Sequence, residues 1–346
     1  MLGEGEVVGK KYRITGVLGR GGMGMVFSAV DEYTRQPCAV KFVPSAKRGG
    51  EYAERLIREA KHAGRIHHAN VVDIFDYGET DEGVFLVMEL LQGFTLSRAM
   101  DQGVMPAEQA IGILIPACRG VSAAHALGVL HRDVKPDNIF LCIDESGRAR
   151  GVKVLDFGIS KRRDPKRAEK SLTRSGEVMG TPRYMSPEQL RGKKDLDERC
   201  DIYALGCVLY EMIEGEHPFD ARTFSHLREA KLAGDMRPFT QDVPIGLREV
   251  IRRALAVDRA QRHADVAQFA EALEPFGKTR FKGKTKWRGT FPGSGEHLLT
   301  SGSTTLPTSA ATTIAKRVWV FPALIVSVAV LVLVALAYWQ WTVLSG

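Results

Sequence analysis

Cysteine is scarce in this chain. Five cysteines occur among 346 residues, and none has the C-x-x-C spacing of a metal site. They are scattered through apolar segments, as is typical of buried thiols in a reducing compartment: Cys38, Cys118, Cys142, Cys200 and Cys207. The sequence therefore indicates neither a disulfide framework nor a cysteine-ligated metal.

An N-terminal signal peptide and internal repeats are also missing. The first residues, MLGEGEVVGKKYRI, lack the apolar central region that a signal peptide requires. Much of the net charge of +7 lies at residues 161–174 and 278–288. Nucleic acid is therefore not the expected partner, and a solvated basic face is the alternative for each run. The length suggests a globular protein of two lobes or domains with additions.

One long apolar run lies near the C-terminus. Residues 318–339, VWVFPALIVSVAVLVLVALAYW, carry no charge. At about 1.5 Å per residue they can cross a bilayer core of about 30 Å. Lys316 and Arg317 precede this run and no basic residue follows it. This predicts a single-pass protein of the inner or plasma membrane, with residues 1–317 in the cytoplasm and 340–346 as a short external tail.

Strand-like and helix-like segments occupy different parts of the chain. Residues 12 to about 100 read mostly as strands with one helix, and helices dominate from Pro106 onward. The expected strands are YRITGVLG, MVFSAVD, PCAVKFVP, VVDIFDYGE and GVFLVMELL. Residues 277–317, basic at first and then rich in Gly, Ser and Thr, are interpreted as a flexible linker before the apolar run.

The stretch GRGGMGMVFSAV, residues 19–30, contains glycines that packing does not explain, because glycine brings no side chain. The spacing Gly19-x-Gly21-x-x-Gly24 alone fits two unrelated phosphate-binding loops and many plain turns. The segment that follows is rich in β-branched and aromatic residues and predicts a strand. This favours a hairpin flap over phosphates, or a plain glycine-rich hairpin, and argues against a nicotinamide-dependent dehydrogenase, whose glycines open a helix.

Charged residues recur beside the later apolar strands. Lys41, in CAVKFV, has alternating apolar neighbours, and Glu59 on the next predicted helix is its natural counter-charge. Either residue alone reads as an ordinary solvated charge. The loops VLHRDVKPDN and VKVLDFG add a dense polar set: His131, Arg132, Asp133, Lys135, Asn138 and Asp156. Caps or turns explain single members of this set but not the whole of it.

With these motifs the sequence resembles the protein kinase family over about residues 12–276. The family's order is kept in G-x-G-x-x-G-x-V, A-V-K, H-R-D-x-K-x-x-N and D-F-G. GTPRYMSPE follows, with Ser186 in place of the usual alanine, and then DIYALG and Arg262. The resemblance implies an α+β, two-lobed protein kinase fold. Its small β-rich lobe would span about 12–91, and its larger, mainly helical lobe about 92–276.

The resemblance implies a site for ATP and Mg²⁺, with Mn²⁺ as an alternative metal. Lys41, oriented by Glu59, would hold the α- and β-phosphates. Asn138 and Asp156 would bind the metal. The implied nucleotide-binding set is Leu18, Gly19, Arg20, Gly21, Gly22, Met23, Gly24, Met25, Val26, Ala39, Lys41, Glu59, Glu89 and Leu91.

The same resemblance implies catalytic roles for Asp133 and Lys135 beside Lys41. Asp133 would accept or orient the proton of the substrate hydroxyl, and Lys135 would steady the γ-phosphate. Phe140 stands where the family usually has a leucine under the adenine, which leaves the pocket shape open.

Three further residues are implied to be structural. Asp201 would accept hydrogen bonds from the backbone around residues 131–132. Glu188 and Arg262 would form a buried ion pair.

Substrate and control also follow from the resemblance. Lys135 and Thr181 are similar to the serine/threonine branch, and GTPRYMSPE implies a protein substrate. The layout is similar to bacterial membrane-bound kinases, here without room for an external sensor domain. Arg132 before Asp133 marks kinases that are switched by phosphorylation. The candidate phosphosites are Ser171, Thr173, Ser175 and Thr181, with autophosphorylation expected at Thr173 or Ser175.

Two alternatives accompany these expectations. A pseudokinase would bind nucleotide as a scaffold without chemistry, although the intact Lys41, Asp133, Asn138 and Asp156 speak against it. A homodimer through the apolar run is a further option, but the run has no G-x-x-x-G pattern.

Overall fold

The computed structural model describes residues 2–20, 24–44, 57, 60–61, 63–157, 181–219 and 223–277. Several predictions concern residues outside these ranges: Gly21, Gly22, Met23, Glu59, Ser171, Thr173, Ser175, most of the linker at 277–317 and the apolar run at 318–339. Among the described residues, no helix is long and apolar enough to cross a membrane.

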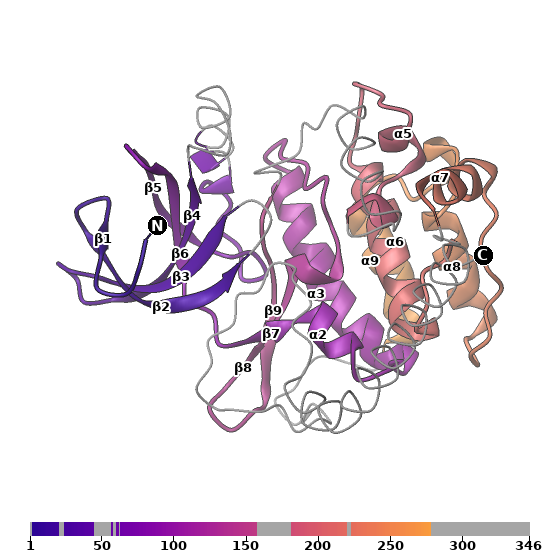
Figure 1. The fold of residues 1–346 in the computed structure, drawn as a ribbon. Helices are drawn as coiled ribbons and strands as arrows, with labels where there is room; N and C mark the ends of the chain where they lie inside the picture. Colours follow the sequence, from indigo (N-terminus) through magenta and orange to yellow (C-terminus); the bar gives the residue numbers. More distant parts are fainter. Residues whose placement is uncertain are drawn as a thin grey trace, which may run out of the picture. The chain divides into compact units, whose positions relative to one another are not determined.

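A six-stranded antiparallel sheet forms the N-terminal lobe (Figure 1). Its strands lie in the order β1-β2-β3-β4-β6-β5. Their bounds are β1 Val7–Val8, β2 Tyr12–Arg20, β3 Met25–Asp31, β4 Pro37–Pro44, β5 Ile74–Thr80 and β6 Gly83–Glu89. The turn from β3 to β4 is closed by Asp31, whose Oδ1 accepts from the backbone N–H of Tyr33 at 2.9 Å and of Thr34 at 3.0 Å.

Alternation along the strands creates two apolar faces, because successive side chains point to opposite sides of a sheet. On β4, Cys38, Val40 and Phe42 pack with Phe27 and Phe85 on one face. The intervening Ala39 and Val43 join a second cluster, which includes residues of the C-terminal lobe. Lys41 has the same parity as Ala39 and Val43, so the strand period directs it to this second face.

The C-terminal lobe combines a small sheet with helices (Figure 1). The sheet has the order β7-β8-β9, with bounds Gly93–Thr95, Ile139–Ile143 and Ala149–Val154. The helices are α2 Leu96–Met100, α3 Ala107–His125, α5 Pro187–Leu190, α6 Arg199–Glu214, α7 Phe224–Ala233, α8 Ile245–Ala254 and α9 Val266–Leu273. Short 3-10 turns are η2 Pro136–Asn138, η3 Thr181–Tyr184, η4 Arg259–Gln261 and η5 Glu274–Phe276. These two lobes confirm the predicted α+β architecture.

Helix α6 is the centre of this lobe. All but two of its residues, Arg199 and Glu211, are buried, which explains why its sequence has apolar residues on every side. It ends at Gly215, whose φ of 75° is the left-handed conformation that glycine adopts without strain. Buried α6 is therefore a rigid base for the loops that pack on it.

The five cysteines are free, and all but the half-buried Cys142 are buried. Burial raises the pKa of Cys38, Cys142 and Cys207 to about 11, because the thiolate is poorly solvated there. The expectation of buried thiols is confirmed for Cys38, Cys118, Cys200 and Cys207.

Candidate active site

The loop before β8 is held by an acid from α6. Asp201 accepts the backbone N–H of His131 at 2.8 Å and of Arg132 at 2.7 Å, as predicted. Arg132 has a φ of 60°, an uncommon conformation for a residue with a side chain. Burial of Asp201 disfavours its charge, but hydrogen bonds with His125 and with the backbone N–H of His131 lower its pKa overall. The ionised carboxylate therefore fixes the strained loop.

Asp133 and Asn138 are tied together at the end of this loop. The Asn138 Nδ2 atom donates to the backbone oxygen of Asp133 at 2.8 Å and approaches its Oδ2 at 3.3 Å. The backbone oxygen of Asn138 accepts the N–H of Leu155 at 2.9 Å, which links the loop to the residue before Asp156. The Asn138 Oδ1 atom is buried and has no hydrogen-bond partner among the described residues. That oxygen is placed to accept a ligand.

Lys41 and Asp156 meet across the two lobes. The Lys41 Nζ lies 2.7 Å from Asp156 Oδ2, with 14% and 23% of the two side chains exposed. Asp156 has a φ of 53°, which turns the chain sharply after β9. Burial disfavours the Asp156 charge, but Lys41, with smaller contributions from His131 and Lys135, lowers its pKa overall. The carboxylate is therefore ionised at neutral pH.

These groups fit a nucleotide with a divalent metal. The unpartnered Asn138 Oδ1 and the Asp156 carboxylate are oxygen ligands, which Mg²⁺ prefers. Lys41 supplies a cation beside them for phosphate oxygens. Lys135 is partly buried in the same loop, and its ammonium lies 3.9 Å from the carboxylate of Asp137.

Gly24 corrects one expectation about the glycine loop. A Cβ atom on Gly24 would lie 2.1 Å from the backbone oxygen of Phe42 on β4. Close strand packing therefore requires this glycine, although the sequence suggested that packing explains none of the four. Gly19 and Arg20 end β2, opposite Val26 and Met25 of β3 in the register of the two strands.

Four of the predicted nucleotide-binding residues belong to one apolar cluster. Leu18, Val26, Ala39 and Leu91 all belong to it, together with the fully buried Phe140. Met25, in contrast, packs against the cluster on the other face of the sheet. Four of the predicted residues thus share one apolar cluster with Phe140 of the C-terminal lobe.

Glu89 has a partner that sequence reasoning missed. Its Oε1 accepts the backbone N–H of Asp73 at 2.8 Å and also contacts the Lys153 ammonium of β9. Lys153 donates further to the backbone oxygen of Val71 at 3.0 Å. The Glu89 carboxylate is therefore bound to Asp73 and Lys153. The only sequence signal was a lysine inside the apolar strand GVKVL.

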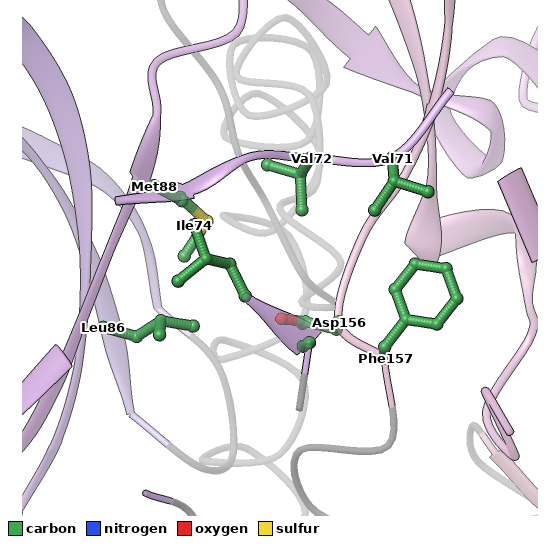
Figure 2. A pocket seen from close by; sticks show the side chains of 8 residues that line it. Val71, Val72, Ile74, Leu86, Met88, Asp156 and Phe157 are labelled. Atoms are coloured by element: carbon green, nitrogen blue, oxygen red, sulfur yellow. The ribbon is translucent and has the colours of Figure 1, made fainter. Parts of the chain in front are cut away.

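A small cavity adjoins the Lys41–Asp156 pair (Figure 2). Apart from Asp156, its lining is apolar: Ala63, Val71, Val72, Ile74, Leu86, Met88 and Phe157. In Figure 2, Ile74, Leu86 and Met88 lie on one side of Asp156 and Phe157 on the other. This lining strengthens the ion pair because a low-dielectric surrounding screens charges poorly.

The segment GTPRYMSPE lies beside the catalytic loop. Ser186, the departure from the usual alanine, caps α5 and forms a capping box with Gln189. Gln189 in turn donates to the backbone oxygen of Arg132 at 3.1 Å. Thr181 begins the turn η3, but its side chain lies outside the described set. The serine therefore supports a contact between this segment and the loop of Asp133.

Glu188 and Arg262 form the predicted buried pair. The guanidinium binds both carboxylate oxygens, at 2.7 and 2.8 Å, and the two side chains are 5% and 0% exposed. Arg262 also donates to backbone oxygens of Ala256, Arg199 and Val257. One side chain thus joins α5, α6 and the region after α8.

Comparisons with known proteins agree with this geometry. The probable serine/threonine-protein kinase PknB of Corynebacterium glutamicum is 36% identical over 283 residues, covering 77% of this chain and 42% of the relative. Serine/threonine-protein kinase Pkn1 of Myxococcus xanthus is 38% identical over 270 residues, covering 76% of this chain and 38% of the relative. The chain thus spans less than half the length of these curated relatives.

A solved structure and a family description give the same result. The PknI kinase domain of Mycobacterium tuberculosis has 26% sequence identity and a TM-score of 0.62, covering 80% of this chain and 99% of that structure. The family model described as "Protein kinase domain" matches residues 12–274. With that match over most of its length, the chain belongs to the protein kinase family.

Proposed function

We propose that the chain is an ATP-dependent serine/threonine protein kinase, which transfers the γ-phosphate to Ser and Thr hydroxyls of proteins. The observations that carry the proposal are the Lys41–Asp156 pair and the Asn138–Asp133 contact, which the bond from the Leu155 N–H to the Asn138 backbone oxygen links. Relatives with serine/threonine kinase names support the choice of acceptor. Bound Mg-ATP supplies the phosphoryl group and neutralises its charge.

Each residue has a distinct part in the proposed mechanism. Lys41 would bind phosphate oxygens, while Asp156 and the Asn138 Oδ1 would hold the divalent cation. Asn138 also holds the Asp133 backbone through its Nδ2 atom, which orients the Asp133 carboxylate. That carboxylate takes the proton of the acceptor hydroxyl. Lys135 offers a second cation to the phosphate being transferred.

Control by phosphorylation is part of the proposal. We expect autophosphorylation at Thr173 or Ser175, with Ser171 and Thr181 as further candidates. The Arg132 Nε atom is buried and has no hydrogen-bond partner in the part of the chain that the structure describes. An added phosphate would supply acceptor oxygens and charge of about −1.5 to −2 for such a group.

The setting is proposed to be a cell membrane. The uncharged run at 318–339 would anchor the chain, with the kinase domain on the cytoplasmic side, and the same run would serve if a homodimer forms. The run at 278–288 contributes basic residues for anionic headgroups, with a solvated linker as the alternative.

Phosphate transfer by the full chain tests the proposed activity. Incubation with γ-labelled ATP, Mg²⁺ and dephosphorylated casein is expected to label serine and threonine of casein and to leave tyrosine unlabelled. Chelation of Mg²⁺ by excess EDTA should remove the labelling, because the proposed reaction needs a divalent cation to neutralise the charge of the phosphates. Peptide mapping of the same sample should place phosphate on the chain between residues 158 and 182.

The control is the same reaction with casein omitted, which isolates labelling of the chain itself. Absence of transfer in the presence of Mg²⁺ or Mn²⁺ would favour the nucleotide-binding scaffold instead. Active protein without phosphate at 158–182 would remove the proposed control but not the activity.

A further inference from the structure

A buried lysine lies on α7, away from the nucleotide groups. Lys231 has no exposed surface, and it and Leu227 are the two buried residues of this helix. Its ammonium donates to the backbone oxygen of Met185 at 2.8 Å and to the backbone oxygen of Arg183. The same ammonium lies 4.9 Å from the ring centre of Tyr203 and 5.5 Å from that of Phe219.

The charge of Lys231 is compensated by carbonyls and rings. Among the described residues, no carboxylate lies within ion-pair distance of its Nζ atom. Burial, together with the nearby Arg183 and Arg262, lowers the pKa of Lys231 to about 8. A buried cation is costly unless its donors are used. Here the donors bind the backbone of a single segment, Thr181–Met185.

That segment is the N-terminal part of GTPRYMSPE, and it leads into the part that contacts the loop of Asp133. Tyr184 donates from its hydroxyl to Glu211 of α6 at 2.6 Å, and the segment leads directly into α5. Gln189 of α5 contacts the backbone oxygen of Arg132, next to Asp133. A shift of the segment therefore changes the surface that an acceptor protein meets beside Asp133. The ATP-binding groups on β4 and after β9 are not touched by Lys231.

We propose that Lys231 is a positioning residue that fixes the segment Thr181–Met185 as the docking surface for the acceptor protein. The inference rests on the proposed kinase activity and adds a residue outside the catalytic loop that sets acceptor binding. Two hydrogen bonds from one ammonium fix the backbone of the segment at two places, Arg183 and Met185. Without them, the acceptor must order this backbone as it binds, so its affinity falls.

Steady-state kinetics of full-chain variants tests this role. Lys231→Met keeps the length and apolar stem of the side chain but removes its donors. We expect its KM for dephosphorylated casein to rise about tenfold, because two charge-assisted hydrogen bonds are lost, while its KM for ATP stays within about twofold. Lys231→Gln retains amide donors on a shorter side chain, so an intermediate KM for casein is expected. Arg228→Met, an exposed cation on the same helix, is the matched control with unchanged constants.

Thermal unfolding separates positioning from general support of the fold. The Met variant should change the unfolding midpoint little, since removal of a costly buried charge offsets the loss of the donor to the two backbone oxygens. An unchanged KM for casein overturns the inference. A lower unfolding midpoint together with a rise in the KM values for both casein and ATP also overturns it. If the Met variant does not fold, the KM values and the unfolding midpoint of Lys231→Gln test the inference in its place. If the wild-type chain labels no casein, both the kinase proposal and the inference are refuted. If the wild type is active and Lys231→Met has the same KM for casein, only the inference is refuted.

Discussion

Asp133→Asn is expected to lower phosphate transfer to casein by about 10²–10⁴-fold while ATP binding is retained, because an amide cannot take the acceptor proton. The loop should keep its shape. The Asn138 bond to residue 133 reaches the backbone oxygen at 2.8 Å, and Asp201 holds the loop through the N–H groups of residues 131 and 132. Initial rates with labelled ATP and nucleotide binding by calorimetry measure the two effects separately.

The matched control is Asp235→Asn, which makes the same chemical change at an exposed position after α7. Its transfer rate should equal that of the unaltered chain. If Asp133→Asn transfers phosphate as fast as the unaltered protein, the proton-accepting role is wrong. If it also loses ATP binding, the residue supports the nucleotide site and not the acceptor hydroxyl.

Local patterns predicted the strands of the N-terminal lobe well. β3 and β4 occupy the predicted segments MVFSAVD and PCAVKFVP, since one face of each strand packs on each apolar cluster. β5 begins only at Ile74, although the prediction started at Val71. Val71 instead pairs with Val154, and the N–H of Val72 donates to the oxygen of Val154 at 3.0 Å. Val71 and Val72 therefore lie outside β5, because they pair with Val154, which is distant in the sequence.

Motifs located the candidate site because its residues lie in short loops with a fixed order. The structure places Lys41 next to Asp156 and Asp133 next to Asn138. The sequence could not show that the Glu89 carboxylate turns toward Lys153, because that contact joins residues 64 positions apart. It also could not show that Asn138 Oδ1 lacks a hydrogen-bond partner among the described residues.

The sequence indicated only that helices dominate from Pro106 onward, and within that region α7 has a weak apolar pattern because of its buried lysine. An amphipathic helix is recognised by apolar residues recurring every three or four positions. In α7 the recurrence runs from Phe224 to Leu227 and then meets Lys231, which lies on the buried side as a cation. The lysine therefore interrupts the apolar pattern in the sequence, although the buried face of the helix continues through Lys231 in the structure. The ring faces of Tyr203 and Phe219 replace the apolar contacts that the pattern would require.

Arg262→Met is expected to lower the free energy of unfolding by about 3–5 kcal/mol, because it leaves the Glu188 carboxylate buried without its counter-charge. Three backbone oxygens also lose their donor. The double variant Glu188→Gln with Arg262→Met should recover part of this loss, since no unpaired charge remains. Chemical denaturation at neutral pH measures all three proteins. Arg259→Met, which breaks an exposed pair with Asp195, is the control and should lose clearly less.

The difference in stability between the unaltered chain and Arg262→Met is expected to depend on pH. In the unaltered chain burial disfavours the Glu188 charge, but Arg262 lowers its pKa overall below 4.5. The pair therefore stabilises the fold above that pH, and the stabilisation is lost as the pH falls through the lowered pKa. In Arg262→Met, burial is opposed only by the weaker hydrogen bonds from the Glu188 backbone and Ser186, so the pKa of Glu188 rises and protonation relieves the variant as the pH falls. The stability gap between the two proteins should consequently narrow between pH 7 and pH 5, and a constant or widening gap would show that the loss comes from the backbone oxygens and not from the stranded carboxylate.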